Sequence, residues 1–174
     1  MIVRLAFHLQ GISQKSVIAT QIFFQKTKKG SPGMLNIRVK YHADIEPIAQ
    51  AHDGEWYDLR LAESTVLWEG DYRLLSLGVS IELPEGYEAL VFPRSSTFDR
   101  YGILMANSGG VIDHRYCGDD DIWRFPAYAT RYIEIPANTR IAQFRLVPVQ
   151  PESRVTAVDH LGNANRGGIG STGR

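Results

Sequence analysis

Short apolar segments separated by turn-forming residues run through the sequence from Met34 to Pro151. Residues 35–41 alternate between apolar and polar side chains, and clusters of Gly, Pro and Asn separate the later apolar segments. Short segments with this spacing are typical of strands, and no part of this region shows the long period of a helix. We therefore predict an all-β sandwich or barrel. Its strands are expected near residues 35–41, 72–81, 89–92, 103–106, 133–135 and 141–149.

Composition narrows the class of protein. A length of 174 residues suits one domain with a substantial core, and the formal net charge of zero argues against a large nucleic-acid-binding surface. The lone Cys117 excludes an internal disulfide framework and fits a reducing compartment. No apolar run reaches the length of a membrane-spanning helix. We expect a cytoplasmic protein with neither a nucleic-acid nor a membrane partner.

Residues 1–33 differ from the rest of the chain. They carry five basic and no acidic residues, whereas the remaining residues hold 14 basic and 19 acidic ones. This segment is an organelle transit peptide, a basic arm that contacts a partner, or translated sequence upstream of a natural start at Met34. The third interpretation is favoured, because strand-like alternation begins directly after Met34.

Two segments in the middle of the chain carry groups suited to binding and catalysis. Residues 93–96, Pro-Arg-Ser-Ser, follow an apolar strand and place an arginine and two hydroxyls where they suit an oxyanion. For this tetrapeptide alone, a plain turn with a surface arginine is the alternative interpretation. Residues 107–118 combine glycines, a short Val-Ile pair, Asp113 and Tyr116. They predict a tight hairpin with a base for activating water. A hairpin whose Asp113 caps a turn and whose Tyr116 is core is equally consistent.

Two further segments lie near the end of the chain. Residues 140–143, Arg-Ile-Ala-Gln, open the last long strand, and alternation would place Arg140 and Ala142 on one face and Ile141 and Gln143 on the other. Residues 166–174 are rich in glycine, with Arg166, a serine and a threonine as donors, so their backbone can wrap a phosphate chain. A frayed terminus is the alternative interpretation.

Taken together and in this order, the segments resemble the five motifs of the trimeric dUTPase family. Residues 56–62, 93–96, 107–118, 138–143 and 166–174 match the five motifs in turn, and residues 125–129 and 160–163 resemble the variant found in Gram-positive bacteria and their phages. The resemblance implies a distorted jelly-roll-like β-barrel over residues 34–160 that forms a homotrimer. Residues 161–174 would form a Gly-rich arm that closes the active site of another subunit.

The resemblance also implies an activity, the hydrolysis of dUTP to dUMP and pyrophosphate with Mg²⁺, which limits uracil in DNA and supplies dUMP. Asp113 would activate the attacking water, Tyr116 would stack on the deoxyribose, and Asp58 would act on Mg²⁺ through water. The backbone of the hairpin, with Asn107, Gly110, Val111 and Ile112, would recognise uracil. The remaining substrate-binding residues implied are Arg94, Ser95, Ser96, Gln143, Arg166, Gly168, Ile169, Ser171 and Thr172.

The sequence departs from the family at the base-stacking position. Ile169 stands where the fifth motif usually has an aromatic residue, so we expect another side chain to cover the exposed face of uracil. Arg124 or Trp123 is predicted to do so, with Arg124 favoured, because a strand over this segment would point Trp123 and Phe125 one way and Arg124 the other. Core positions for Trp123 and Phe125 are the plainer alternative.

Two other functions are compatible with parts of this pattern. A dCTP deaminase-like enzyme shares the Arg-Ser-Ser element but needs a glutamate after the third motif, and residues 123–129 contain none. A phage-type dUTPase scaffold can also act as a regulatory protein that binds a repressor. The intact Asp113, Tyr116 and Arg166 favour a chain that retains catalysis.

Overall fold

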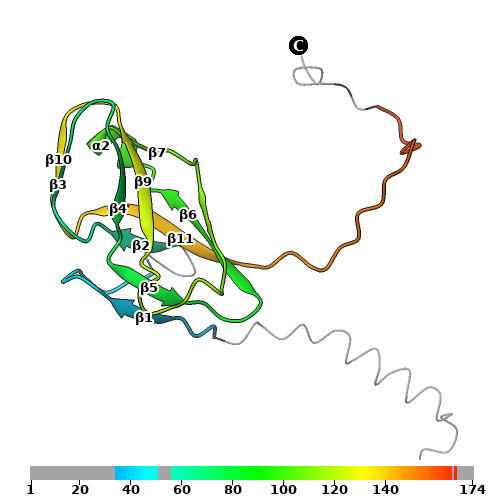
Figure 1. Cartoon of the computed structure of the whole chain (residues 1–174), viewed down its shortest axis with the longest axis horizontal. Helices are drawn as coiled ribbons and strands as arrows, with labels where there is room; N and C mark the ends of the chain where they lie inside the picture. Colours follow the sequence, from blue (N-terminus) through cyan, green and yellow to red (C-terminus); the bar gives the residue numbers. More distant parts are fainter. Residues whose placement is uncertain (1–33, 51–55, 166, 168–174) are drawn as a thin grey trace, which may run out of the picture.

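The structure of the protein is a computed structural model that describes residues 34–50, 56–165 and 167 (Figure 1). Within these residues, short antiparallel strands are accompanied by one five-residue helix, α2 (Thr97–Tyr101). The prediction of an all-β fold is confirmed. No helix in the described part of the chain is long and apolar enough to cross a membrane. Residues 1–33 lie outside the described residues. The prediction that they precede a natural start at Met34 therefore stays a prediction.

Two larger sheets form the body of the barrel. The four-stranded sheet has the order β2 (Tyr57–Arg60), β11 (Arg140–Pro148), β6 (Tyr87–Pro93) and β8 (Gly110–Ile112). The three-stranded sheet has the order β4 (Tyr72–Ser76), β9 (Arg124–Ala129) and β7 (Ile103–Met105). Two further pairs join β1 (Arg38–Tyr41) to β5 (Val79–Glu82), and β3 (Thr65–Leu67) to β10 (Ile133–Ile135). Strand β8 therefore lies at one edge of the larger sheet.

Aromatic side chains connect the two larger sheets in the core. Trp123, just before β9, packs edge-on against Phe144 of β11, with ring centroids 5.2 Å apart. Tyr57 of β2 stacks on the same Phe144 ring at 4.9 Å. Trp123, Phe125 and Phe144 are fully buried, and burial of each such side chain stabilises the fold by about 1.5–3 kcal/mol. The alternative that places Trp123 and Phe125 in the core is therefore confirmed.

The segment predicted as one strand over residues 72–81 is two strands, because the chain turns at Gly78. Gly78 has a φ of +66°, and a Cβ at this position would lie 3.2 Å from the Cβ atoms of Ala43 and Ala62. Both the backbone conformation and the close packing require glycine. The turn moves the chain from the three-stranded sheet into the β1–β5 pair. The other predicted strands are present, with boundaries displaced by no more than three residues.

Candidate active site

Three of the five motif segments meet at one end of the four-stranded sheet. Asp58 in β2 lies opposite Gln143 in β11, and Ala142 in β11 lies opposite Pro93 at the end of β6. Arg94 follows Pro93, and its Nε lies 2.7 Å from Oδ1 of Asp58. Gln143 Nε2 donates a hydrogen bond to the Pro93 carbonyl at 3.4 Å. The sheet register thus brings together Asp58, Arg94 and Gln143, which the sequence placed in separate motifs.

A bulge in β11 adds Arg140 to this cluster. The register between β11 and β2 shifts between Arg140 and Ala142, and both Ile141 and Ala142 are buried. The predicted alternation of faces over residues 140–143 is therefore wrong, because the extra residue of a bulge interrupts the two-residue period. Arg140 Nη1 donates to Asp58 Oδ2 at 3.0 Å, so Asp58 contacts two guanidinium groups.

The buried hydroxyl of Thr97, which is not among the predicted site residues, holds the Arg-Ser-Ser segment in place. The backbone N–H of Arg94 donates to Thr97 Oγ1 at 3.0 Å, and Thr97 Oγ1 donates to the Ile141 carbonyl at 2.9 Å. Ser96 is the N-cap residue of α2 but makes no side-chain capping bond. The Ser95 and Ser96 hydroxyls thus lie beside Arg94 without a role in capping α2. A threonine directly after two serines was the available signal for this anchor.

The segment predicted as a hairpin is a tight turn whose two arms belong to different sheets. Strand β7 pairs with β9, whereas β8 pairs with β6, so the hairpin prediction is wrong in its pairing. Residues 106–109 form the turn, with the Ser108 N–H bonded to the Met105 carbonyl at 2.9 Å. A Cβ on Gly109 would lie 2.8 Å from the Phe92 ring, so a side chain there would require this ring to move. The outer edge of β8, including Gly110, Val111 and Ile112, has no strand partner within the described residues.

Asp113 follows β8 directly and is surrounded by its own turn. The Tyr116 N–H donates to the Asp113 carbonyl at 3.0 Å. Arg115 donates to the Asp113 carboxylate three times: from its backbone N–H to Oδ1 at 2.8 Å, from Nε to Oδ1 at 2.9 Å and from Nη2 to Oδ2 at 2.8 Å. These hydrogen bonds hold the pKa of the Asp113 carboxyl far below its usual range, so it is ionised at neutral pH. Arg115 is not among the residues predicted for the site, although a basic residue two positions after a turn aspartate was visible in the sequence.

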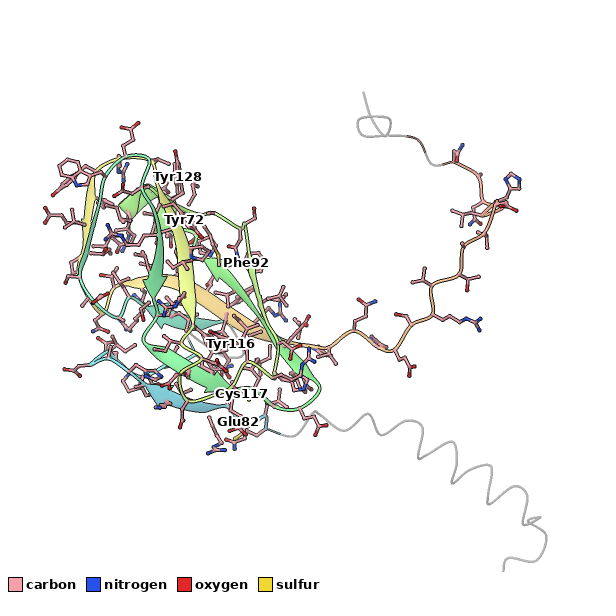
Figure 2. All side chains as sticks on the ribbon, in the orientation of Figure 1. Tyr72, Glu82, Phe92, Tyr116, Cys117 and Tyr128 are labelled. Carbon is pink, nitrogen blue, oxygen red and sulfur yellow. The ribbon has the colours of Figure 1, made fainter. Side chains whose placement is uncertain are left out.

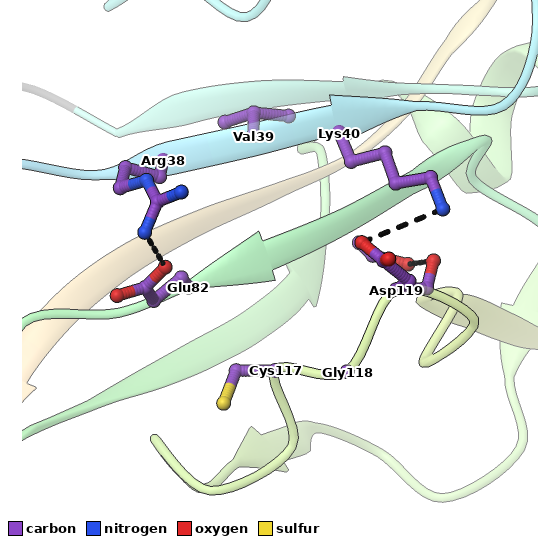
Figure 3. A pocket seen from close by; sticks show the side chains of 8 residues that line it. Arg38, Val39, Lys40, Glu82, Cys117, Gly118 and Asp119 are labelled. Atoms are coloured by element: carbon purple, nitrogen blue, oxygen red, sulfur yellow. Dashed lines mark hydrogen bonds and ion pairs between the residues drawn. The ribbon is translucent and has the colours of Figure 1, made fainter.

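An ion pair and a hydrogen bond attach the loop after Tyr116 to the β1–β5 pair (Figure 3). Lys40 Nζ of β1 lies 3.5 Å from Asp119 Oδ1, and the Ser80 hydroxyl of β5 donates to the Asp119 carbonyl at 3.2 Å. Tyr116 and Cys117 are exposed. Tyr116 therefore presents its ring at the surface from a loop with fixed ends, rather than contributing to the core.

The two predicted stacking residues have different environments. Trp123 has 1% of its surface exposed and its ring packs on Phe144, so it cannot cover a bound base and that half of the prediction is wrong. Arg124, the first residue of β9, is exposed. The strand alternation expected for residues 123–125 is observed, and of the two candidates only Arg124 is accessible to a ligand.

The chain leaves the barrel after β11, and residues 150–165 are exposed throughout (Figure 1). Arg166, Gly168, Ile169, Ser171 and Thr172 lie outside the described residues, so their predicted contacts with substrate remain predictions. Gly167 is the one residue of the segment 166–174 that the structure describes, and its φ of +98° is a conformation that favours glycine.

The two groups of site residues lie apart within one chain. Strand β8 pairs with β6 so that Ile112 faces Ala89, and Asp113 therefore lies near the start of β6, whereas Arg94 follows its end. Six residues of strand separate these levels, which corresponds to about 20 Å. Figure 2 shows Phe92, near Arg94, and Tyr116, near Asp113, at separate heights of the barrel. A single chain does not bring Asp113 to the Asp58, Arg94 and Gln143 cluster.

Comparison with known proteins identifies similar sequences. A family model described as dUTPase matches residues 44–173. The chain is 47% identical over 140 residues to the SPbeta prophage-derived deoxyuridine 5'-triphosphate nucleotidohydrolase of Bacillus subtilis, which covers 80% of this chain and 99% of that protein. It is 31% identical over 142 residues to the deoxyuridine 5'-triphosphate nucleotidohydrolase of Nautilia profundicola, with the same two coverages. The predicted similarity to proteins of Gram-positive bacteria and their phages is confirmed.

Solved structures show the same fold. The dUTPase of Staphylococcus bacteriophage 80alpha with dUpNHpp superposes with a TM-score of 0.63 at 22% identity, over 80% of this chain and 99% of that one. A dUTPase mutant from phage phi11 of S. aureus, described with a structural Mg(II) ion, has a TM-score of 0.61 at 18% identity, over 72% and 98% of the two chains. At these identities the likeness concerns the fold.

Proposed function

Because this chain belongs to the dUTPase family, we propose that it is a dUTP diphosphatase, which hydrolyses dUTP to dUMP and pyrophosphate. The observation that carries the proposal is that three motifs far apart in the sequence form one site with a net positive charge, composed of Asp58, Arg94, Arg140 and Gln143. A triphosphate carries about four negative charges and needs several guanidinium and N–H donors. Arg94 and Arg140, with the Ser95 and Ser96 hydroxyls nearby, form such a set.

The edge of β8 suits the recognition of uracil. An edge strand presents backbone N–H and C=O groups to any partner, and uracil offers two carbonyl acceptors around one N–H donor. Residues from Asn107 to Ile112 would pair with this edge through their backbone, and the tight turn would leave no room for a 5-methyl group. The exposed Tyr116 ring would pack on the deoxyribose and exclude a 2′-hydroxyl.

Asp113 is the proposed general base. One carboxylate oxygen accepts a proton from water while the water oxygen forms a bond to the α-phosphorus. The bond from the α-phosphorus to the bridging oxygen breaks, and the electron pair leaves with pyrophosphate. The ionised state of Asp113 supports this role, since a base must be deprotonated before it accepts a proton.

The residues present fit an Mg²⁺ ion that arrives with the substrate. Asp58 Oδ1 pairs with Arg94 and Oδ2 with Arg140, so this carboxylate already balances two guanidinium groups. A contact with the metal through water, as proposed for Asp58, is compatible with both ion pairs. Within the described residues, no group of three or more His, Cys, Asp or Glu side chains could hold a metal. Mg²⁺ usually keeps several waters and binds substrate phosphates. When bound, it would neutralise charge on the phosphates.

We further propose that complete sites form between subunits of a homotrimer. The separation of about 20 Å between Asp113 and Arg94 along the sheet supports a site in which a second copy brings its Asp113 to the Arg94 cluster. Residues 161–174 would close the site, with Arg166, Gly168, Ile169, Ser171 and Thr172 on the substrate. Arg124 would cover the uracil ring, because a guanidinium plane stacks on aromatic faces.

The alternative functions receive less support. The relatives described above are named for deoxyuridine triphosphate, which does not favour a dCTP deaminase-like activity. A structural neighbour, a dUTPase mutant of Staphylococcus bacteriophage 80alpha, is described in terms of phage dUTPases that control transfer of virulence genes. At 19% identity, its likeness to this chain concerns the fold alone. Binding of a repressor by this chain therefore stays a prediction. The cytoplasm is the proposed location, where dUTP is found and the Cys117 thiol stays reduced.

The decisive experiment measures pyrophosphate release from dUTP in the presence of Mg²⁺, with dTTP, dCTP and UTP as matched controls. We expect turnover of dUTP and little of the other three. A chain that releases pyrophosphate equally from dTTP, or from none of the four, would contradict the proposal.

A further inference from the structure

Arg115 forms hydrogen bonds to both carboxylate oxygens of the proposed general base, Asp113. Its Nε and Nη2 engage Oδ1 and Oδ2 of Asp113, and its backbone N–H adds a second bond to Oδ1. A base accepts the proton of water on a lone pair, and a carboxylate held by a guanidinium fork is a poor proton acceptor. The arrangement in the isolated chain therefore opposes the reaction that Asp113 is proposed to perform.

The ion pair between Arg115 and Asp113 lies at the surface and can dissociate at a small cost in free energy. The two side chains are 80% and 48% exposed, and ion pairs of this kind are weak and screened by salt. His114 Nδ1 lies 3.5 Å from Asp113 Oδ1 and is the other cationic group that acts on this carboxylate when protonated. On β6, which pairs with β8, the charged residue nearest to Asp113 along the ladder is Glu88. Among the described residues, the hydrogen bonds and ion pairs of the Arg115 side chain go to Asp113 alone.

A bound triphosphate offers Arg115 a stronger partner. In the proposed reaction a single water separates Asp113 from the α-phosphate, so the phosphates lie within reach of the long Arg115 side chain. A guanidinium matches two phosphate oxygens as well as it matches two carboxylate oxygens, and the triphosphate carries more charge. Transfer of Arg115 to the phosphates would free the Asp113 oxygens at the moment when a substrate is present.

We propose that Arg115 is a positioning residue that holds Asp113 in the ligand-free protein and moves to the substrate phosphates on binding. The general base is then released by substrate itself. This inference rests on the proposed function, because it requires that Asp113 faces the α-phosphate of a nucleoside triphosphate.

The first test compares the Asp113 pKa in the wild type and in Arg115→Ala by carbon NMR of the carboxyl group, assigned with Asp113→Asn. Without ligand, we expect a higher pKa in Arg115→Ala, because the cation that favours the ionised form is gone. With dUpNHpp bound, this difference should disappear, because Arg115 has left Asp113 in the wild type. Equal pKa values without ligand, or an undiminished difference in the complex, would overturn the proposal.

Arg38→Ala is the matched control. Arg38 pairs with Glu82 on the β1–β5 pair with side chains 73% and 50% exposed, so this variant removes the same charge from an equally exposed pair. Its Asp113 pKa should equal that of the wild type in both states.

Kinetics give a second, independent test. The acid limb of kcat/KM against pH reports the free enzyme's base, so it should move to higher pH in Arg115→Ala. KM for dUTP should rise about tenfold or more, because a charge-assisted bond to phosphate is lost. An active wild type whose Arg115→Ala variant behaves like Arg38→Ala would refute this inference alone. A wild type that releases no pyrophosphate from dUTP would instead refute the proposed function.

Discussion

The Asp58 carboxylate lies 2.7 Å from the Arg94 guanidinium, and 13% and 24% of these side chains are exposed. The contact joins the edge strand β2 to the end of β6, and these two strands lie on opposite sides of β11 in the four-stranded sheet. Since Arg140 also donates to Asp58, one carboxylate sets the position of two arginines. The structure thus assigns Asp58 a part in shaping the phosphate site, beside its proposed contact with Mg²⁺ through water.

Asp58→Asn should weaken both substrate binding and stability. The change leaves Arg94 without its counter-ion in a partly buried setting, which we expect to lower the free energy of unfolding by about 1–3 kcal/mol. KM for dUTP should rise more than kcat falls, because the arginines lose their alignment on the phosphates. Chemical denaturation and steady-state kinetics measure the two effects. Glu46→Gln is the control, since Glu46 pairs with Arg60 at an exposed position, and an equal effect there would contradict the role given to Asp58.

Asp113→Asn should fold and bind dUpNHpp but lose most turnover. Removal of a positioned general base typically costs on the order of a hundred- to ten-thousandfold in rate. Calorimetric binding of the analogue, measured beside pyrophosphate release, separates the two effects. A near-normal kcat in this variant would exclude Asp113 as the base.

Mixing two inactive variants tests whether sites are shared between subunits. Asp113→Asn and Arg94→Ala each damage every site of a homo-oligomer. If Asp113 and Arg94 of one site come from different chains, co-refolded mixtures will contain some sites with both natural residues and will regain activity. Each variant refolded alone provides the baseline. No recovery in a mixture that assembles normally would place both residues of a site in one chain.

Tyr116→Ala should reduce discrimination between dUTP and UTP. The exposed ring of Tyr116 is proposed to fill the space of a 2′-hydroxyl, so its removal should narrow the ratio of the two kcat/KM values. Tyr116→Phe keeps the ring and should keep the ratio. An unchanged ratio in Tyr116→Ala would move sugar selectivity to another residue.

Arg124 and Trp123 should respond to mutation in opposite ways. Arg124→Ala removes an exposed side chain, so the fold should keep its stability while dUpNHpp binds more weakly. A lost stack corresponds to about 1–3 kcal/mol of binding free energy. Trp123→Leu opens a cavity against Phe144 and should lower the free energy of unfolding by about 2–4 kcal/mol. Thermal unfolding and calorimetry distinguish these outcomes, and unchanged affinity in Arg124→Ala would leave the covering of uracil to the tail.

Local patterns predicted most strands but not their partners. The segment over residues 133–135 was predicted with its observed boundaries, because its apolar residues lie between clear turn signals. The hairpin over residues 107–118 was mispaired, because glycines predict a turn but do not determine which strands receive its two arms. The bulge between Arg140 and Ala142 could not be predicted from the segment 140–143, because a bulge is defined by the pairing of two strands.

The sequence by itself determined the all-β class, the order of the motifs and the kinds of group that each supplies, because strand alternation, turn residues and side-chain chemistry are local properties. Tertiary structure alone decided that Asp58, Arg94, Arg140 and Gln143 meet, because sheet register joins residues far apart in the chain. It also decided that Trp123 is buried while Arg124 is exposed, since a strand pattern gives two faces without saying which one faces the core. The separation of Asp113 from Arg94 follows from the antiparallel pairing of β6 and β8, which no single segment encodes.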